Sequence, residues 1–111
     1  MFKKPRVRDE KHCDFIRSLS CATCGDNTST EAAHIRMGDP RAAKRPTGMQ
    51  EKPDDRWVIP LCGRDHREQH HVGERAFWAG KEIDPIFLAL ALYGVSGDHE
   101  AGEQIIQEMR H

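Results

Sequence analysis

Apolar residues in the first half of the chain are spaced in ways that predict one short helix and two short strands. Between residues 9 and 19, apolar positions recur at the three- and four-residue intervals of a helix. Residues 28–36 form a short segment between two turn-forming sequences and are predicted to hold a strand that carries His34. Residues 57–61 are rich in β-branched and aromatic side chains, so they predict a second strand with Cys62 at its end.

The second half of the chain is predicted to be helical. One helix should begin near Arg64, run toward Trp78 and end at Gly80. Pro85 suits the first turn of a second helix, which carries an apolar run up to Gly94. A final amphipathic helix follows the turn at residues 96–98. The predicted order is therefore helix, strand, long loop, strand and helix, with two helices appended.

Length and composition indicate a single globular domain. The chain has 111 residues, 37% of them hydrophobic and 32% charged, which suits one domain of common size and not a disordered chain. Its longest apolar run is much shorter than the roughly 18 residues of a membrane span, and its first residues are charged, unlike a signal peptide. We therefore expect a cytoplasmic protein with no membrane partner. In such a reducing compartment, four cysteines favour metal binding over disulfides.

The charge is distributed unevenly along the chain. Residues 1–67 hold 14 Lys and Arg against 10 Asp and Glu, whereas residues 68–111 hold 3 against 8. The loop at residues 37–55 is long for a small domain, a feature of functional or disordered segments. Its basic residues, with one just before it, are candidate contacts to a nucleic-acid strand: Arg36, Arg41, Lys44, Arg45 and Lys52. A solvated charged surface without a partner would have the same composition.

The spacing of cysteines predicts a structural zinc site. Cys21 and Cys24 lie two residues apart in one segment, and Cys62 and Asp65 have the same spacing in another. Two ligands on each of two segments are the arrangement that tetrahedral zinc sites use, and a carboxylate oxygen can serve as the fourth ligand. His66 is the alternative fourth ligand, and buried free thiols are the alternative to a metal site. Cys13 lies outside the pattern and is predicted to be a packing residue.

The histidines suggest a second site. His66 and His70 are four residues apart on a predicted helix, so they share one face and can converge on a metal or a phosphate. If zinc joins Cys62 to the first two cysteines, this face is held close to the strand that carries His34. The three histidines can then meet in one cleft.

Three segments together resemble the HNH nucleases of the ββα-metal type, and more narrowly the small HNH proteins of bacterial prophages. They are Glu31-Ala-Ala-His34-Ile-Arg36, Lys52-Pro-Asp-Asp-Arg-Trp57 and Pro60-Leu-Cys62-x-x-Asp65-His66-Arg-Glu-Gln-His70. The likeness extends over roughly residues 6–93. It implies an α+β fold: a zinc-stapled, treble-clef-like ββα-metal core at about residues 20–80, an additional N-terminal helix, and a helical extension at about residues 84–111. Residues 1–111 would then form a single nuclease domain.

The resemblance implies a metal-dependent DNA endonuclease that hydrolyses phosphodiester bonds. His34 would be the general base, and His66 and His70 would bind a catalytic divalent cation (Mg²⁺, Mn²⁺, Ni²⁺ or Zn²⁺). The family usually has an asparagine that orients the base; here Asp54 or Asp55 would take its place and could help to hold the cation. The preferred DNA and the oligomeric state remain open.

One position departs from the family pattern. Many HNH enzymes have a metal ligand directly before the general base, whereas this chain has Ala33. The chain could therefore be a zinc-containing DNA-binding module that has lost catalysis. A separate alternative is an interaction protein that uses the two C-terminal helices.

Overall fold

A computed structural model describes residues 7–48 and 52–110. Residues 1–6, residues 49–51 of the predicted loop and residue 111 lie outside the described residues. The element order is α1, β1, a short 3-10 helix, β2, α2, α3, α4 and α5. The fold is therefore α+β, as the sequence predicts.

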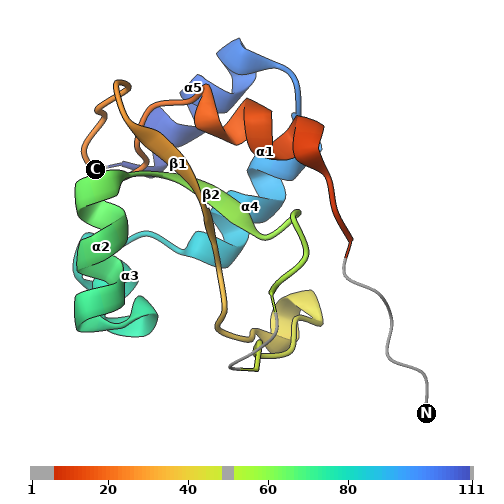
Figure 1. Cartoon of the computed structure of the whole chain (residues 1–111), viewed down its shortest axis with the longest axis vertical. Coiled ribbons are helices and arrows are strands. Elements are labelled where there is room, and N and C mark those ends of the chain that lie inside the picture. The colour runs from red at the N-terminus through yellow and green to blue at the C-terminus, as the bar shows by residue number, and fades with distance from the viewer. Residues whose placement is uncertain (1–6, 49–51, 111) are drawn as a thin grey trace.

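An antiparallel pair of strands lies in the middle of the molecule (Figure 1). β1 (Thr30–His34) pairs with β2 (Val58–Cys62), so that His34 is opposite Val58 and Thr30 is opposite Cys62. All five residues of β2 are buried. The loop between the strands contains one turn of 3-10 helix at Pro40–Ala42, which begins at the Asp39 cap.

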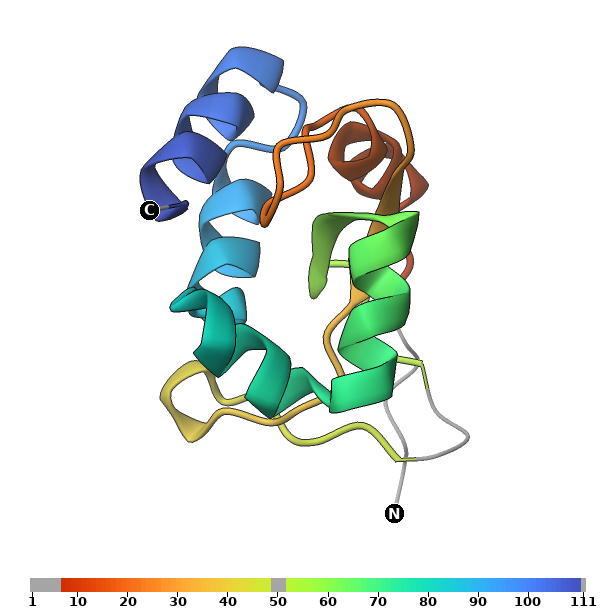
Figure 2. The same cartoon turned by 90° about the vertical axis from the view of Figure 1, so that its left-hand side faces the viewer.

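Helices pack around this sheet. α1 (Glu10–Arg17), α2 (Gly63–Val72) and α4 (Pro85–Gly94) contact β2, while α5 (His99–Met109) packs against α4. Figure 2 shows α2 apart from the α4–α5 pair, with α3 (Glu74–Lys81) between them along one edge. The core contains apolar side chains from the sheet and from α1, α3, α4 and α5, among them Ile16, Ile59, Leu88, Leu92 and Ile106.

Side-chain caps explain where several helices begin. Asp9 accepts a hydrogen bond from the His12 amide at the start of α1, and Asp98 accepts one from the Ala101 amide at the start of α5. Asp84 accepts from two amides at the start of α4, where Pro85 occupies the first turn as predicted. The predicted bounds of α4 are therefore confirmed.

The single helix predicted from Arg64 to Gly80 is wrong. The chain forms two helices, α2 and α3, which are separated at Gly73. Gly73 has a φ of 93° and a ψ of 144°, a conformation that ends one helix and redirects the chain into the next. The buried Trp78 ring nitrogen then donates to Gln69 Oε1 at 2.8 Å and holds the two helices together. Among the helices in the described ranges, none is long and apolar enough to span a membrane.

Candidate functional site

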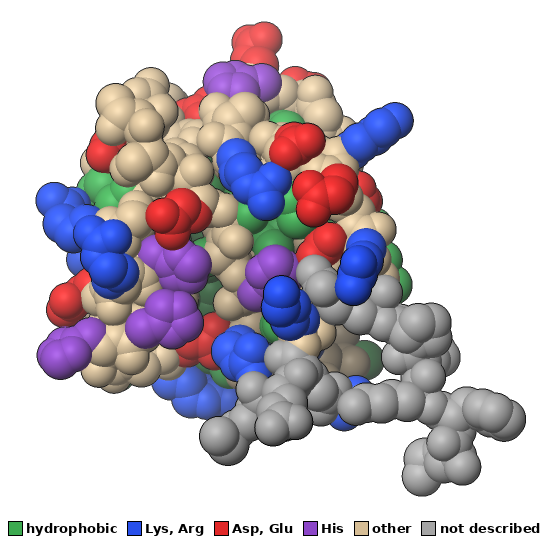
Figure 3. All heavy atoms as spheres, in the orientation of Figure 1, with side chains coloured by type: hydrophobic (Ala, Val, Ile, Leu, Met, Phe, Trp, Pro, Cys, Tyr) green, Lys and Arg blue, Asp and Glu red, His purple; other side chains and the backbone are tan. Residues whose placement is uncertain are grey.

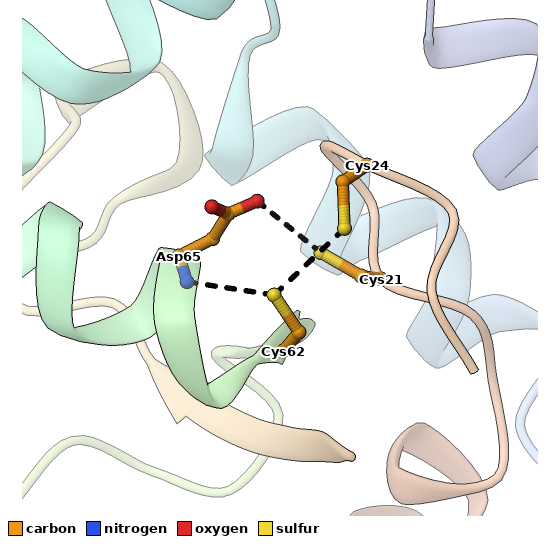
Figure 4. A group of neighbouring side chains, drawn as sticks. All are labelled: Cys21, Cys24, Cys62 and Asp65. Atoms are coloured by element: carbon orange, nitrogen blue, oxygen red, sulfur yellow. Dashed lines mark hydrogen bonds between the residues drawn. The ribbon is translucent and has the colours of Figure 1, made fainter. Parts of the chain in front are cut away.

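Four metal-binding side chains meet where the first turn of α2 faces the turn after α1 (Figure 4). Cys21 and Cys24 come from that turn, Cys62 ends β2, and Asp65 lies in the first turn of α2. One ligand atom from each residue lies within 4.8 Å of all the others. The backbone explains the meeting, because the Ala22 amide donates to the carbonyl of Pro60 and joins the cysteine turn to β2.

The distances in this group suit a tetrahedral ion. The sulfur atoms of Cys24 and Cys62 are 3.8 Å apart, too far for a disulfide. Metal–sulfur bonds of about 2.3 Å at tetrahedral angles give a separation of roughly 3.8 Å between two sulfurs. The Cys21 sulfur lies 3.7 Å from Asp65 Oδ2, a separation similar to that between the two sulfurs. The group could therefore hold a metal ion.

Thr23 supports the same group electrostatically. Its hydroxyl donates to Asp65 Oδ2 at 2.6 Å and lies 3.2 Å from the Cys21 sulfur. Burial alone would raise the pKa of both acidic groups. For Cys21, the contact with Thr23 and hydrogen bonds from nearby backbone amides outweigh burial and lower the pKa. For Asp65, the Thr23 hydroxyl and the Arg64 guanidinium lower the pKa below its usual value. Both effects favour the deprotonated forms that bind metals.

The structure distinguishes between the two candidates for the fourth ligand. Asp65 belongs to the group, whereas His66, one residue later, directs its Nδ1 toward Glu31. Cys13 lies elsewhere, buried in α1, and is the packing residue that its position predicts. Burial and then the charge of Asp55 raise the pKa of the Cys13 thiol to about 11, so this thiol stays protonated at neutral pH.

His34 is paired with one of the two candidate aspartates. Its Nε2 lies 2.9 Å from Oδ1 of Asp55, whose side chain is 3% exposed, whereas the His34 side chain is 28% exposed. The other oxygen of Asp55 accepts the backbone amide of Asp9, at the start of α1, at 2.7 Å. Asp54 instead accepts the amide of Val7 at 2.8 Å. Asp55 is therefore the carboxylate that orients His34.

His66 and His70 lie side by side on α2, as their spacing predicts. Their ring centroids are 5.0 Å apart. His66 Nδ1 lies 2.7 Å from Oε1 of Glu31, on β1. Figure 3 shows histidines gathered among Lys and Arg side chains on the face that carries α2 and β1 in Figure 1. The contacts form two separate pairs, His34 with Asp55 and His66 with Glu31.

The five basic residues predicted to contact nucleic acid have different surroundings. Arg41 makes ion pairs with Asp39 and Asp84, and Arg36 donates to the carbonyl of Gly48. Lys44 is 7% exposed and donates to the carbonyl of Met37 at 2.8 Å. Lys44 therefore stabilises the loop between the strands, and little of its surface is left for contact with a nucleic-acid strand.

Basic side chains line a hollow of about 490 Å³ near the N-terminal end of the described chain. Arg45, Lys52 and Arg56 are exposed residues on its wall, with Asp54 as the acidic member. The Arg56 guanidinium lies 5.3 Å from the centre of the Trp57 ring. Asp54, which lines the hollow, directly precedes in the chain the residue that contacts His34.

Sequence reasoning gave no role to Glu31 or Thr23. Glu31 stood only at the start of the motif that contains His34, and Thr23 lies between Cys21 and Cys24. Side chains alternate along a strand, so the sequence does indicate that Glu31 and Ala33 lie on the same face of the sheet. Its contact with His66, 35 residues away, depends on how α2 packs against β1.

Comparison with curated proteins and with solved structures finds no match to this chain. One protein family matches residues 1–82, which include α1, the sheet, α2 and α3. Its description is "Protein of unknown function (DUF968)". Because the match covers well over half of the chain and contains both candidate sites, the protein belongs to the DUF968 family.

Proposed function

We propose that this protein is a metal-dependent DNA endonuclease of the HNH, or ββα-metal, type. The observation that carries the proposal is the contact between His34 and the buried carboxylate of Asp55. A histidine that solvent reaches is held by an acceptor that solvent barely reaches, an arrangement suited to general-base catalysis. The succession of β1, β2 and α2 and the resemblance of the motifs to HNH nucleases support the same proposal.

The proposed reaction is hydrolysis of a phosphodiester bond. His34 donates its Nε2 proton to Asp55, so Nδ1 is the nitrogen that accepts a proton from the attacking water. The Asp55 carboxylate then stabilises the imidazolium that results. When bound by His66 and His70, a divalent cation would stabilise the charge on the phosphate and on the departing oxygen.

His66 and His70 suit such a cation. The imidazoles lie beside each other on one helix, and neutral imidazole is a good ligand for zinc, nickel and related ions. His66 is partly open to solvent, with 25% of its side chain exposed, which leaves room for an ion and a substrate oxygen. Ala33, where many HNH enzymes have a ligand, is buried and apolar and contributes none.

DNA is the proposed substrate because basic groups lie next to the proposed catalytic residues. Arg45, Lys52 and Arg56 line the hollow beside Asp54, and cations of this kind bind the phosphates of the DNA backbone. Such contacts fix the position of the strand without reading its sequence. We therefore expect binding with strong salt dependence and weak sequence preference.

For the cysteine group we propose zinc. Three thiolates and one carboxylate form a donor set that prefers zinc to magnesium or calcium, and the distances fit tetrahedral geometry. All four residues are protein ligands, so the site is closed and its proposed role is structural. The ion would fix the start of α2, and with it His66, relative to the end of β2.

Cleavage of supercoiled plasmid tests the nuclease directly. We expect nicking or linearisation with at least one of Mg²⁺, Mn²⁺, Ni²⁺ or Zn²⁺, and none after chelation. Replacement of the general base in His34→Ala should lower the cleavage rate by about 100-fold or more. His71→Ala, on the same helix at an exposed position, is the matched control and should cleave normally. DNA affinity, measured by a gel-shift assay, should be retained in both variants.

Two results would contradict the proposal. If DNA binds but no cation supports cleavage, the protein is a zinc-containing DNA-binding module instead, a reading that Ala33 favours. If His34→Ala cleaves as fast as the unaltered protein, His34 is not the general base.

A further inference from the structure

Glu31 lies on the face of β1 where the expected metal ligand is missing. Glu31 and Ala33 are two residues apart in a strand, so their side chains leave the sheet on the same side. Ala33 is 1% exposed and has no ligand atom. Glu31 has a longer side chain, 52% exposed, which reaches α2 and places Oε1 2.7 Å from Nδ1 of His66. A carboxylate therefore reaches this side of β1 from two residues upstream.

Gly63 makes room for that carboxylate at the start of α2. A Cβ atom built at Gly63 would lie 3.2 Å from Oε2 of Glu31 and 3.2 Å from Nη1 of Arg67. Such contacts are tighter than most, so a side chain at Gly63 would displace the Glu31 carboxylate or the Arg67 guanidinium by a few tenths of an ångström. The first turn of a helix also favours a negative charge because its amide groups point toward it. Glycine at this position thus allows the contact between β1 and α2.

We propose that Glu31 positions His66 to bind a divalent cation. Its carboxylate accepts the Nδ1 proton, so the ring has its lone pair on Nε2. A carboxylate that fixes the tautomer of a histidine in this way is a recurrent feature of metal sites. Nε2 of His66 and the adjacent ring of His70 then bind the cation together. The effect of Glu31 on metal binding does not depend on the proposed nuclease function. Only the use of that metal in catalysis rests on the proposed function.

The first test measures the tautomer. In zinc-loaded protein with no other metal, ¹⁵N chemical shifts of the histidine rings should show His66 protonated on Nδ1. Glu31→Ala should give a mixture of tautomers, whereas Glu31→Gln keeps an oxygen acceptor and should preserve the Nδ1 form. Gly63→Ala crowds the carboxylate without removing it and should shift the mixture in the direction of Glu31→Ala.

The second test measures metal affinity with Ni²⁺ as the probe, by calorimetry on the same zinc-loaded protein. Binding should be lost in His66→Ala and weakened 10- to 100-fold in Glu31→Ala. Glu31→Gln should bind within a few-fold of the unaltered protein. Glu68→Ala, an exposed carboxylate on α2, removes the same charge and should leave the affinity unchanged.

The outcomes separate this inference from the nuclease proposal. Normal Ni²⁺ affinity and an unchanged His66 tautomer in Glu31→Ala would overturn the role of Glu31, whether or not plasmid is cleaved. Ni²⁺ binding that does not depend on His66 would overturn it as well. If Glu31 controls the tautomer and the affinity but no cation supports cleavage, only the proposed nuclease fails.

Discussion

At the scale of single residues, the buried His12 shows how burial disfavours the charged form of a side chain. His12 lies in α1 with 0% exposure, and its Nδ1 is 2.8 Å from the hydroxyl of Ser96. Its Nε2 has no hydrogen-bond partner within the described part of the chain. Burial lowers the pKa of His12 from 6.5, although the charges of Asp9 and Asp55 partly oppose the shift. The folded protein therefore keeps this ring neutral.

We predict that His12 makes the fold less stable in acid. The unfolded chain binds a proton at His12 near pH 6.5, whereas the folded chain does so only at lower pH. Because the unfolded state then holds more protons, stability falls as the pH decreases below about 6.5. Urea unfolding at pH 7.5 and pH 5.5 should show a smaller loss in His12→Gln than in the unaltered protein. His71→Gln, at an exposed position, should lose as much stability as the unaltered protein; an equal loss in all three would exclude His12 as the cause.

At the scale of elements, Gly73 separates α2 from α3 and thereby sets the direction of both. At its φ of 93°, a side chain is strained even though a Cβ would meet nothing within 4 Å. The cost of a side chain at Gly73 is therefore a backbone cost and not a steric clash with neighbours.

We predict that Gly73→Ala destabilises the protein by about 1–3 kcal/mol. Gly80→Ala is the matched control, because Gly80 lies inside α3, where a Cβ also meets nothing within 4 Å and no left-handed backbone is required. Alanine there should be neutral or should stabilise the protein by up to about 1 kcal/mol, since alanine favours helices more than glycine does. The difference in unfolding free energy between the two variants is the measurement, and equal values would contradict a strained Gly73.

At the scale of the whole molecule, the cysteine group joins segments that are far apart in the chain. The C-terminal helix supports it from outside, because Glu103 of α5 accepts hydrogen bonds from the amide and the hydroxyl of Ser20. Arg110 donates to the carbonyl of Cys21 at 3.4 Å. The segment that carries Cys21 is thus held by α5 and by the residue after it, which lie beyond the residues that the DUF968 family matches.

We predict that removal of the metal with a strong chelator unfolds the domain, because binding and folding are coupled at structural sites. Circular dichroism should show loss of helix, and one equivalent of Zn²⁺ should restore it. Cys24→Ala should lose helix at lower chelator concentration, whereas Cys13→Ala, which alters a thiol outside the group, should keep zinc in the same 1:1 ratio. A chain that remains fully helical without metal would rule out this role.

Local signals in the sequence were sufficient for most elements. Apolar spacing and the Asp84-Pro85 start predicted α4, and β-branched residues predicted β2. The paired spacing of Cys21, Cys24 and Cys62 also predicted the metal-binding group, because a zinc site with two ligands on each segment leaves a regular pattern in the sequence. The break at Gly73 was missed, since a glycine inside a helical pattern does not reveal its φ.

The sequence by itself determined the α+β class, the cysteine group and the nearness of His66 to His70, because these depend on short-range spacing. Only the tertiary structure decided that Asp55 and not Asp54 orients His34, that Lys44 is buried, and that Glu31 reaches His66. These contacts join residues brought together by the packing of α1 and α2 against the sheet. The distances between these side chains depend on the direction of the backbone and on which side chains are buried in the core. No local pattern in the sequence encodes either.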